Sequence, residues 1–330
     1  MAIFNTKKWA GILFSLLLAV VFSVAAQDMD EVIEKSFKVG EGGLLTVNSD
    51  MGAIEVETAS GSTLDAKVIR RLDGWSRSEA EEFLKNFQVE FSQSGKDVSV
   101  TAKYRGRRSD HHGNLQVRFL FRVPSKYNVN LNTAGGSISV ADLEGKVEAE
   151  TAGGSLSFGN IKGPVNGRTA GGSISLDGGT GVVDVRTSGG SINIGDVDGD
   201  LNARTAGGSI SIDRAKGNVI AETSGGSIRV DEVMGNIDAS TSGGSVQASI
   251  SQQPKGDCRL ETSAGSVTVY LADNVAVDVD ARASWGRIES DFPIGGGADT
   301  EESSLHGKIN GGGPKLVLRS SSGKVKIRKR

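Results

Sequence analysis

The sequence predicts an all-β protein in which a single chain winds into a parallel β-solenoid with coils of about 18 residues. The first observation is the phrase T-[AS]-G-G-S-[ILV], which recurs seven times at one constant spacing. The second is a period-two alternation of apolar and polar residues within each copy, which is typical of strands. Repetition at a short fixed period outranks local propensity as a guide to the fold. The copies begin at Thr133, Thr151, Thr169, Thr187, Thr205, Thr223 and Thr241.

Each repeat is expected to form two short strands, one over positions 5–8 and one from position 14 to the next threonine. The Gly-Gly pair is expected to make one corner, because glycine adopts a positive φ at little cost. A glycine at position 13, such as Gly145, is expected to make the other corner. A looser copy of the phrase begins at Thr262, and degenerate echoes occur at Ser49, Ala283 and Ser320.

Stacking is required because a single isolated repeat cannot bury its apolar face. In a stack, each strand pairs with the equivalent strand of the next coil at about 4.8 Å. Identical positions then form ladders, with aliphatic residues inside, threonine at position 1 and serine at position 5. The outward position 18 carries a ladder with three adjacent arginines. That ladder runs Glu150, Arg168, Arg186, Arg204 and Glu222.

Two other repeat folds share parts of this pattern. Left-handed hexapeptide helices have coils of the same length, but they need an aliphatic residue at every sixth position. Here the aliphatic residues fall at positions 6, 8, 11, 15 and 17, so this fold is the less favoured alternative. Calcium-binding nonapeptide rolls require G-G-x-G-x-D, whereas serine and isoleucine follow the glycines here, so we reject that fold.

Residues 1–26 are predicted to form a signal peptide. Lys7 and Lys8 supply a positive start, an apolar run follows, and Ala25 and Ala26 supply a small-residue cleavage site. An uncleaved membrane anchor is the alternative, because the run is close to the length that spans a bilayer. No later segment is apolar enough to span a membrane. Cleavage removes two lysines and changes the formal net charge from −3 to about −5, which does not favour nucleic-acid binding.

Three regions are expected after the signal peptide. Irregular coils with a helix over 76–87 form an N-terminal cap, the regular repeat follows in coils of eighteen to twenty-one residues, and C-terminal coils with a polar loop end the chain. These regions are residues 27–130, 131–282 and 283–330. A cap is needed because an exposed end of a solenoid is an open sheet edge.

The expected elements of the two ends follow from local signals. Ser76 or Ser78 is suited to N-cap the helix, and Phe83, Leu84 and Phe87 form its apolar stripe. At the other end, residues 315–318 and 324–327 are expected to be the closing strands, followed by a basic tail over 328–330.

Four segments carry a family resemblance. They are an early coil of the form G-x-L-x-V-x-S-x-x-G-x-I, the segment FRVPS at 121–125, the repeated T-x-G-G-S-I, and a final L-x-L-x-S-S-S-G-K-V-x-I from Leu316. Together they resemble the bacterial β-strand-repeat proteins of unknown function whose domain is labelled a "putative adhesin". The resemblance covers about residues 30–328. It implies a right-handed parallel β-solenoid in an exported envelope protein, and it brings no catalytic or binding residues.

The weak metal candidates are Asp196, Asp198 and Asp200, which form the sequence D-V-D-G-D. This sequence lacks the spacing and the twelfth-position glutamate of an EF-hand loop. Aspartates beside glycine are typical of turns, and we favour that interpretation. We therefore predict no metal site and no cofactor.

The serine ladder and the single cysteine do not predict a nucleophile. A serine that recurs in every coil is structural, and the repeats contain no histidine to act as its base. Cys258 has no partner for a disulfide within the chain and is expected to be buried.

The candidate contacts for an anionic ligand are arginines. Arg105, Arg107 and Arg108 lie in a loop that could bind phosphate or uronate groups, although a charged loop that protects a strand edge explains them equally well. His111 and His112 follow in the same loop. We interpret this loop as a solvated hairpin in preference to a metal site. The other candidates are Arg168, Arg186 and Arg204 of the outward ladder.

The sequence thus predicts a class of function and no particular ligand. The favoured hypothesis is a non-enzymatic exported protein of the bacterial periplasm or cell surface, whose regular faces bind an envelope protein, a glycan or a surface polymer. One alternative is a structural rod that self-associates through an edge coil. Another is a carbohydrate-active β-helix enzyme that acts through the Asp196–Asp200 segment.

Overall fold

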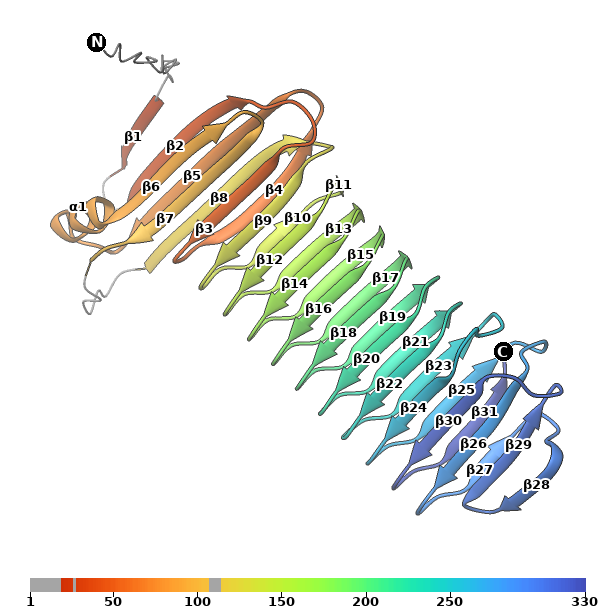
Figure 1. Cartoon of the computed structure of the whole chain (residues 1–330). Helices are drawn as coiled ribbons and strands as arrows, with labels where there is room; N and C mark the ends of the chain where they lie inside the picture. Colours follow the sequence, from red (N-terminus) through yellow and green to blue (C-terminus); the bar gives the residue numbers. More distant parts are fainter. Residues whose placement is uncertain (1–18, 26–27, 107–113) are drawn as a thin grey trace, which may run out of the picture.

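Two long β-sheets form a rod of stacked coils (Figure 1). The structure is a computed structural model that describes residues 19–25, 28–106 and 114–330. Sheet A has 16 strands and sheet B has 15, and the described residues contain a single helix. The expectation of an all-β fold with one short helix is therefore confirmed. No helix among these residues is long and apolar enough to cross a bilayer.

Each regular coil gives one strand to each sheet, and equivalent residues of successive coils pair in parallel. Ile174 pairs with Ile192 in sheet A, and Val165 pairs with Val183 in sheet B. The aliphatic ladders point between the sheets and are buried. The regular strands of sheet A are β10 (Ile138–Val140), β13 (Leu156–Lys162), β15 (Ile174–Thr180), β17 (Ile192–Asp198), β19 (Ile210–Ala215), β21 (Ile228–Val233), β23 (Val246–Ile250) and β25 (Val267–Leu271), and the short β11 (Leu143–Glu144) also pairs with β13.

The second strand of each coil lies in sheet B. These strands are β9 (Asn128–Thr133), β12 (Val147–Thr151), β14 (Val165–Thr169), β16 (Val183–Thr187), β18 (Leu201–Thr205), β20 (Val219–Thr223), β22 (Ile237–Thr241) and β24 (Cys258–Thr262). They match the expected second strand, whereas the sheet A strands after β10 run beyond position 8, as β13 does. Cys258 at the start of β24 is buried, as expected.

The threonine that opens each repeat closes a corner with its hydroxyl. Thr187 Oγ1 donates to the carbonyl of Gly172 at 2.7 Å and accepts from the N–H of Gly190 at 3.3 Å. Thr187 is only 6 % exposed, so the side chain satisfies two backbone groups that have little access to water. The threonine ladder is therefore a structural feature of the corner.

The Gly-Gly corner needs glycine for space and not for a positive φ, so our expectation on this point was wrong. Neither Gly153 nor Gly154 has a positive φ. A Cβ on Gly154 would lie 2.1 Å from the carbonyl oxygen of Gly136 in the preceding coil, whereas a Cβ on Gly153 would have no atom nearer than 3.9 Å. A positive φ does occur at the opposite corner, for example at Gly163.

The first and last coils are each inserted between two others. At the N-terminal end, β3 lies between β7 and β9, and β4 lies between β8 and β10. At the C-terminal end, β30 lies between β24 and β26, and β31 lies between β25 and β27. The bounds are β3 (Leu44–Ser49), β4 (Ala53–Ala59), β7 (Asp97–Tyr104), β8 (Asn114–Pro124), β26 (Val277–Ala283), β27 (Ile288–Ser290), β30 (Lys315–Ser320) and β31 (Val325–Lys329). Residues 315–318 and 325–327 therefore lie in strands, much as expected, but these two last strands of the chain are not at the end of the rod.

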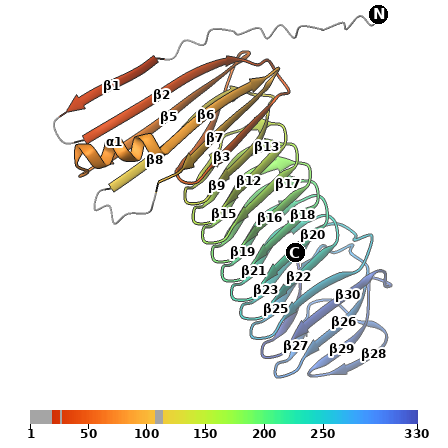
Figure 2. The same cartoon turned by 60° about the vertical axis from the view of Figure 1, so that its left-hand side comes forward.

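Antiparallel strands end both sheets at the N-terminal end of the rod and sheet B at the C-terminal end (Figure 2). In sheet A, β5 pairs antiparallel with both β8 and β2, and β1 pairs antiparallel with β2; in sheet B, β6 pairs antiparallel with β7. At the C-terminal end, β29 pairs antiparallel with β26 and β28. These strands are β1 (Ala19–Ala25), β2 (Asp28–Lys38), β5 (Thr63–Asp73), β6 (Phe87–Ser94), β28 (Gly295–Glu301) and β29 (Ser304–Ile309). Most of the predicted signal peptide lies outside the described residues, and only its end forms β1.

Helix α1 (Arg77–Asn86) connects β5 of sheet A with β6 of sheet B. Ser76 is its N-cap and forms a reciprocal capping box with Glu79. Phe83 is buried and its ring stacks on Phe87 and Tyr104, at centroid distances of 5.6 Å and 5.2 Å. The aromatic cluster thus joins the helix to the end of sheet B.

Candidate functional site

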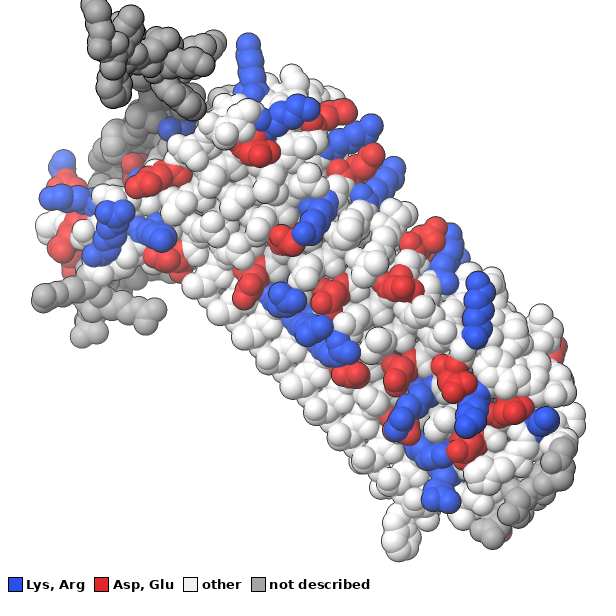
Figure 3. All heavy atoms as spheres, in the orientation of Figure 1, with Lys and Arg blue, Asp and Glu red and all other residues white. Residues whose placement is uncertain are grey.

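Three arginines form a column on the outer face of sheet B. Arg168, Arg186 and Arg204 lie on neighbouring strands in direct register, and we call them the arginine column. Their side chains are 51 %, 46 % and 32 % exposed. Figure 3 shows a run of basic side chains over the middle coils in this region. The structure therefore brings together three of the six predicted anion contacts.

Three carboxylates lie beside the column: Glu150 and Glu222 pair in register with its two ends, and Asp184 contacts Arg186. Arg186 Nε is 3.3 Å from Asp184 Oδ1, and Arg168 approaches the same carboxylate at 4.0 Å. Arg204 donates to Glu222 at 2.7 Å, and this hydrogen bond raises the pKa of Arg204 above its usual value. Asp184 is thus shared by two guanidinium groups at a half-exposed site, where each ion pair contributes little. Because the three side chains are partly exposed, an anion from solvent can reach their outer N–H groups.

A hollow of about 590 Å³ lies at the threonine corner next to the column. Arg168 lines both features, so the hollow and the column form one continuous surface on neighbouring coils. The other polar side chains of the hollow include Asn48, Lys103, Asn132 and Glu150. Lys103 and Arg168 share the hollow with the carboxylates Asp50 and Glu150, so its charges balance. With Asn48 and Asn132 it offers both hydrogen-bond donors and acceptors to a polar ligand.

The aspartates of the D-V-D-G-D segment each bond to a residue of the next coil. Asp198 Oδ2 lies 2.7 Å from Lys216 Nζ, and Asp196 forms an ion pair with Arg214. Asp200 accepts from the backbone N–H of Asn218 at 2.8 Å. Within the described ranges, no group of three potential ligands is arranged to hold a metal ion. The segment contributes cross-strand ion pairs, which stabilise a sheet surface.

Of the remaining predicted anion contacts, the structure describes Arg105, which does not lie on the strands of the column. Arg105 follows β7, and its backbone N–H donates to the carbonyl of Asn86 at 2.9 Å. Arg107, Arg108 and the histidine pair lie outside the described residues.

Sequence reasoning missed a groove of about 770 Å³ on the outer face of sheet A. Leu120 and Ile69 supply apolar surface, and charged side chains of β2, β5, β8 and β4 surround them. These charges are paired across strands, as Arg118 with Glu55 at 2.8 Å and Lys67 with Glu34 at 2.8 Å. The pairing β2–β5–β8–β4 leaves no repeat in the sequence, so the register that builds the groove had no detectable signal.

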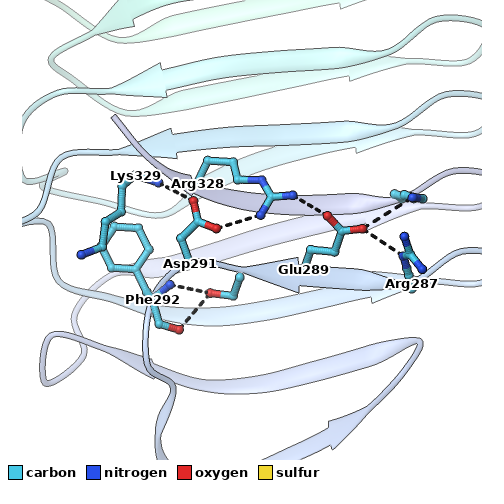
Figure 4. A network of polar contacts seen from close by, with 8 residues as sticks. Arg287, Glu289, Asp291, Phe292, Arg328 and Lys329 are labelled. Carbon is cyan, nitrogen blue, oxygen red and sulfur yellow. Dashed lines mark hydrogen bonds and ion pairs between the residues drawn. The ribbon is translucent and has the colours of Figure 1, made fainter.

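A second missed feature is an ion-pair network on the last coils (Figure 4). Glu289 of β27 contacts Arg287 at 2.9 Å and Lys324 at 3.5 Å, and it also pairs with Arg328. These cations, Arg287 first, lower the pKa of Glu289 to about 2. Arg328 also contacts Asp291 at 2.8 Å. The residues that were expected to form a basic tail are thus held by acids of neighbouring strands.

The serine ladder is structural, as expected. The Oγ of Ser137 accepts from the backbone N–H of Ser155 at 3.2 Å, and the Oγ of Ser155 accepts from the N–H of Ser173 in the same way. The hydroxyls therefore link successive corners. The chemistry that the outer faces offer is ionic and hydrogen-bonded contact with a ligand.

Comparison with solved structures gives matches over most of the chain, among them three of low sequence identity. A "putative adhesin" from Parabacteroides merdae is 10 % identical with a TM-score of 0.38, and covers 91 % of this chain and 96 % of its own. A "putative adhesin" from Bacteroides fragilis is 10 % identical with a TM-score of 0.31, and the match covers 91 % of this chain and 97 % of that one. A "putative lipid binding protein" from Parabacteroides distasonis is 13 % identical with a TM-score of 0.38, and the match covers 90 % of this chain and 97 % of that one.

A comparison with curated proteins gives no match. The model of one family, Toastrack DUF4097, matches residues 81–328. This match includes most of the helix, all the regular coils and the inserted C-terminal coil, which is well over half of the chain. It also agrees with the resemblance to a family of unknown function that the repeats suggested. The chain therefore belongs to the Toastrack DUF4097 family.

Proposed function

We propose that this protein is an exported, non-enzymatic bacterial protein that binds an anionic polymer along the outer face of sheet B. The observation that carries the proposal is the arginine column, which presents three guanidinium groups at the spacing of one strand. A polymer with regularly spaced carboxylates or phosphates can contact several coils at once, so that weak single contacts add up. The coil is proposed to be right-handed, as the family resemblance implied.

The regular coils support a binding function more than a catalytic one. The column is built from one position of the repeat, and the hydroxyls of the serine ladder are used in the corners. Asp198, the best acid for a carbohydrate-active enzyme, is held by Lys216. We propose that acidic polysaccharides are bound without being cleaved. Turnover of such a polymer that is lost in Asp198→Ala would contradict this part of the proposal.

Export is proposed from the N-terminal segment. The positively charged start, the apolar run and the two alanines are expected to direct secretion and cleavage after Ala26. The mass of the protein recovered from the periplasm or the medium should correspond to a chain that begins at Gln27. Recovery of the intact chain in the membrane fraction would favour the anchor instead.

Ligand binding is tested with a panel of immobilised polymers. We expect the protein to bind polygalacturonate or another anionic polysaccharide at low ionic strength and to leave dextran unbound. Added salt should weaken the binding, because mobile ions screen exposed charges. Equal binding to the neutral and the anionic polymer would contradict the proposed ligand class.

A further inference from the structure

Strand β2 is the last strand of sheet A apart from β1. Within the described part of the chain, β1 pairs only with β2, over seven residue pairs from Ala19 opposite Glu34 to Ala25 opposite Asp28. Strand β1 lies inside the predicted signal peptide, so the cleavage proposed above would remove it. The 11 residues of β2 would then form an open edge. Such an edge is a template for another strand, and β1 occupies it in the intact chain.

Alternate residues of β2 direct their backbone groups to that edge. The N–H of Val39 donates to the carbonyl of Ser62 at 2.9 Å, which places this pair in the hydrogen-bonded ladder with β5. In an antiparallel pair this pattern alternates, so the odd-numbered residues of β2 bond to β5. The even-numbered residues direct their N–H and C=O groups to the edge. Those residues include Asp30, Val32, Glu34 and Ser36.

We propose that two copies of the processed chain form a twofold dimer in which β2 pairs antiparallel with the second copy's β2. This inference rests on the proposed export and cleavage. Hydrogen bonding requires that even-numbered residues face even-numbered residues across the new pair. The register that places Ile33 opposite Ile33 meets this condition, and it is the register to which we commit.

Charge selects this register over its neighbours. With Ile33 at the twofold axis, Glu31 lies opposite the second copy's Lys35, once on each side of the axis. Sliding one strand along the other to the next register that allows hydrogen bonding places Asp30 opposite the second copy's Glu34. Sliding it the other way places Glu34 opposite the second copy's Glu34. Like charges directly opposite destabilise a pair of strands, whereas opposite charges stabilise it. The acids of the first half of β2 and the lysines of its second half thus complement a second copy of the same strand.

The side chains that would meet are already held by their own copy. Glu31 forms an ion pair with Arg70, whose Nη1 also donates to the carbonyl of Phe87 at 2.7 Å. Lys35 Nζ lies 4.8 Å from the centre of the Phe91 ring. Both side chains therefore lose little conformational freedom when the strands pair. On the outer face, Glu34 and Ser36 line the groove of sheet A, so the dimer would place two such grooves on one continuous sheet.

Sedimentation equilibrium of the processed protein tests the dimer with two substitutions at one position. Val32→Pro removes an N–H that faces the edge and leaves the ladder with β5 in place, as proline on an edge strand can. Val32→Ala keeps that N–H. We expect the wild type and Val32→Ala to dimerise. In Val32→Pro the dimer dissociation constant should rise by at least about tenfold, because one hydrogen bond is lost in each copy.

Three controls show whether the edge itself is responsible. Far-UV circular dichroism and thermal unfolding should be similar for the three proteins. Lys35→Glu should also weaken the dimer, because it places two acids opposite each other. The unprocessed chain, in which β1 covers the edge, should be monomeric. A processed chain that is monomeric at every concentration would overturn the proposal, as would a dimer that Val32→Pro and Lys35→Glu leave unchanged.

Failure of export and failure of the dimer give different results. If secretion leaves residues 1–26 attached, the mass of the recovered protein shows that the export proposal is wrong. A chain that begins at Gln27 and is produced directly in the cytoplasm then shows whether the edge dimerises. All strand pairs other than β1–β2 are retained in that chain.

Discussion

The hydroxyl of Ser320 donates to the carbonyl of Gly265 at 2.7 Å, as Thr187 does to Gly172 in the regular coils. Ser320 also accepts from the N–H of Gly323 at 2.8 Å. The corner is therefore built in the same way in a coil that departs from the repeat. Because serine lacks the methyl group of threonine, the hydroxyl alone makes these two contacts.

Replacement of Thr187 tests this role of the hydroxyl. Thr187→Val keeps the shape of the side chain but leaves the carbonyl of Gly172 and the N–H of Gly190 without a partner. Buried groups of this kind cost about 1–3 kcal/mol when unpaired, and the free energy of unfolding should fall by about that amount. Thr187→Ser should lose less, because both hydrogen bonds are kept. Urea denaturation measures the two values, and equal losses would contradict the role of the hydroxyl.

The two glycines of one corner provide a matched pair. A Cβ at Gly154 would meet the backbone of the preceding coil at 2.1 Å, whereas the nearest atom to a Cβ at Gly153 is 3.9 Å away. We expect Gly154→Ala to lower the free energy of unfolding by about 1–3 kcal/mol, because the coils must separate locally. Gly153→Ala should change it by less than about 0.5 kcal/mol. The same denaturation measurement applies, and a similar effect of both substitutions would contradict the steric account.

The ion-pair network of the last coils predicts a dependence of stability on pH. The pKa of Glu289 is lowered from 4.5 to about 2, so its carboxylate binds a proton more readily in the unfolded chain. The contribution of this carboxylate to the free energy of unfolding is fully present above about pH 4.5 and is lost as the pH falls towards 2. The melting temperature of Glu289→Gln should therefore lie below that of the wild type at pH 6. The two melting temperatures should converge as the pH falls from about 4.5 towards 2. A constant difference across the window would contradict the assignment.

Cys258 should react only when its coil opens. It is 1 % exposed, and burial raises the pKa of its thiol, so little reactive thiolate is present in the folded chain. We expect labelling by a thiol reagent at neutral pH to be slow in buffer and fast in denaturant. Labelling followed by mass spectrometry measures the rates, with Cys258→Ala as the unlabelled control. Fast labelling of the folded protein would show that β24 is exposed.

The repeat predicted the regular coils and even the echoes outside them. Ser49, Ala283 and Ser320 all occupy the threonine position, since Ser49 pairs with Thr133, Ser320 pairs with Thr262, and Ala283 pairs with Ser320. A position that faces the interior of a corner tolerates few residue types, so a pattern remains visible. The sequence predicted the Gly-Gly corner correctly but attributed it to a positive φ. The actual cause is close contact between successive coils, which the backbone preferences of a single residue do not reveal.

The order of the end coils could not be predicted. Ser320 lies beside both Thr262 and Ala283, although it follows Ala283 in the chain. The sequence shows which residues have equivalent places in a coil, but it does not show which coil lies next to which. For the same reason, the groove of sheet A and the contact of Arg328 with Asp291 depend on pairings that leave no periodic pattern. The arginine column was predicted because it lies within the repeat.

The central claim is tested most directly by replacing the arginine column. Polygalacturonate binding should be measured for Arg168→Gln/Arg186→Gln/Arg204→Gln against a control in which Arg118, Arg122 and Arg229 are replaced by glutamine. Both triple variants lose three positive charges, so long-range attraction is weakened equally. We predict that the column variant loses at least about tenfold in affinity, which is about 1.4 kcal/mol, while the control stays within about threefold of the wild type. Equal losses in the two variants, or wild-type affinity in the column variant, would contradict the account.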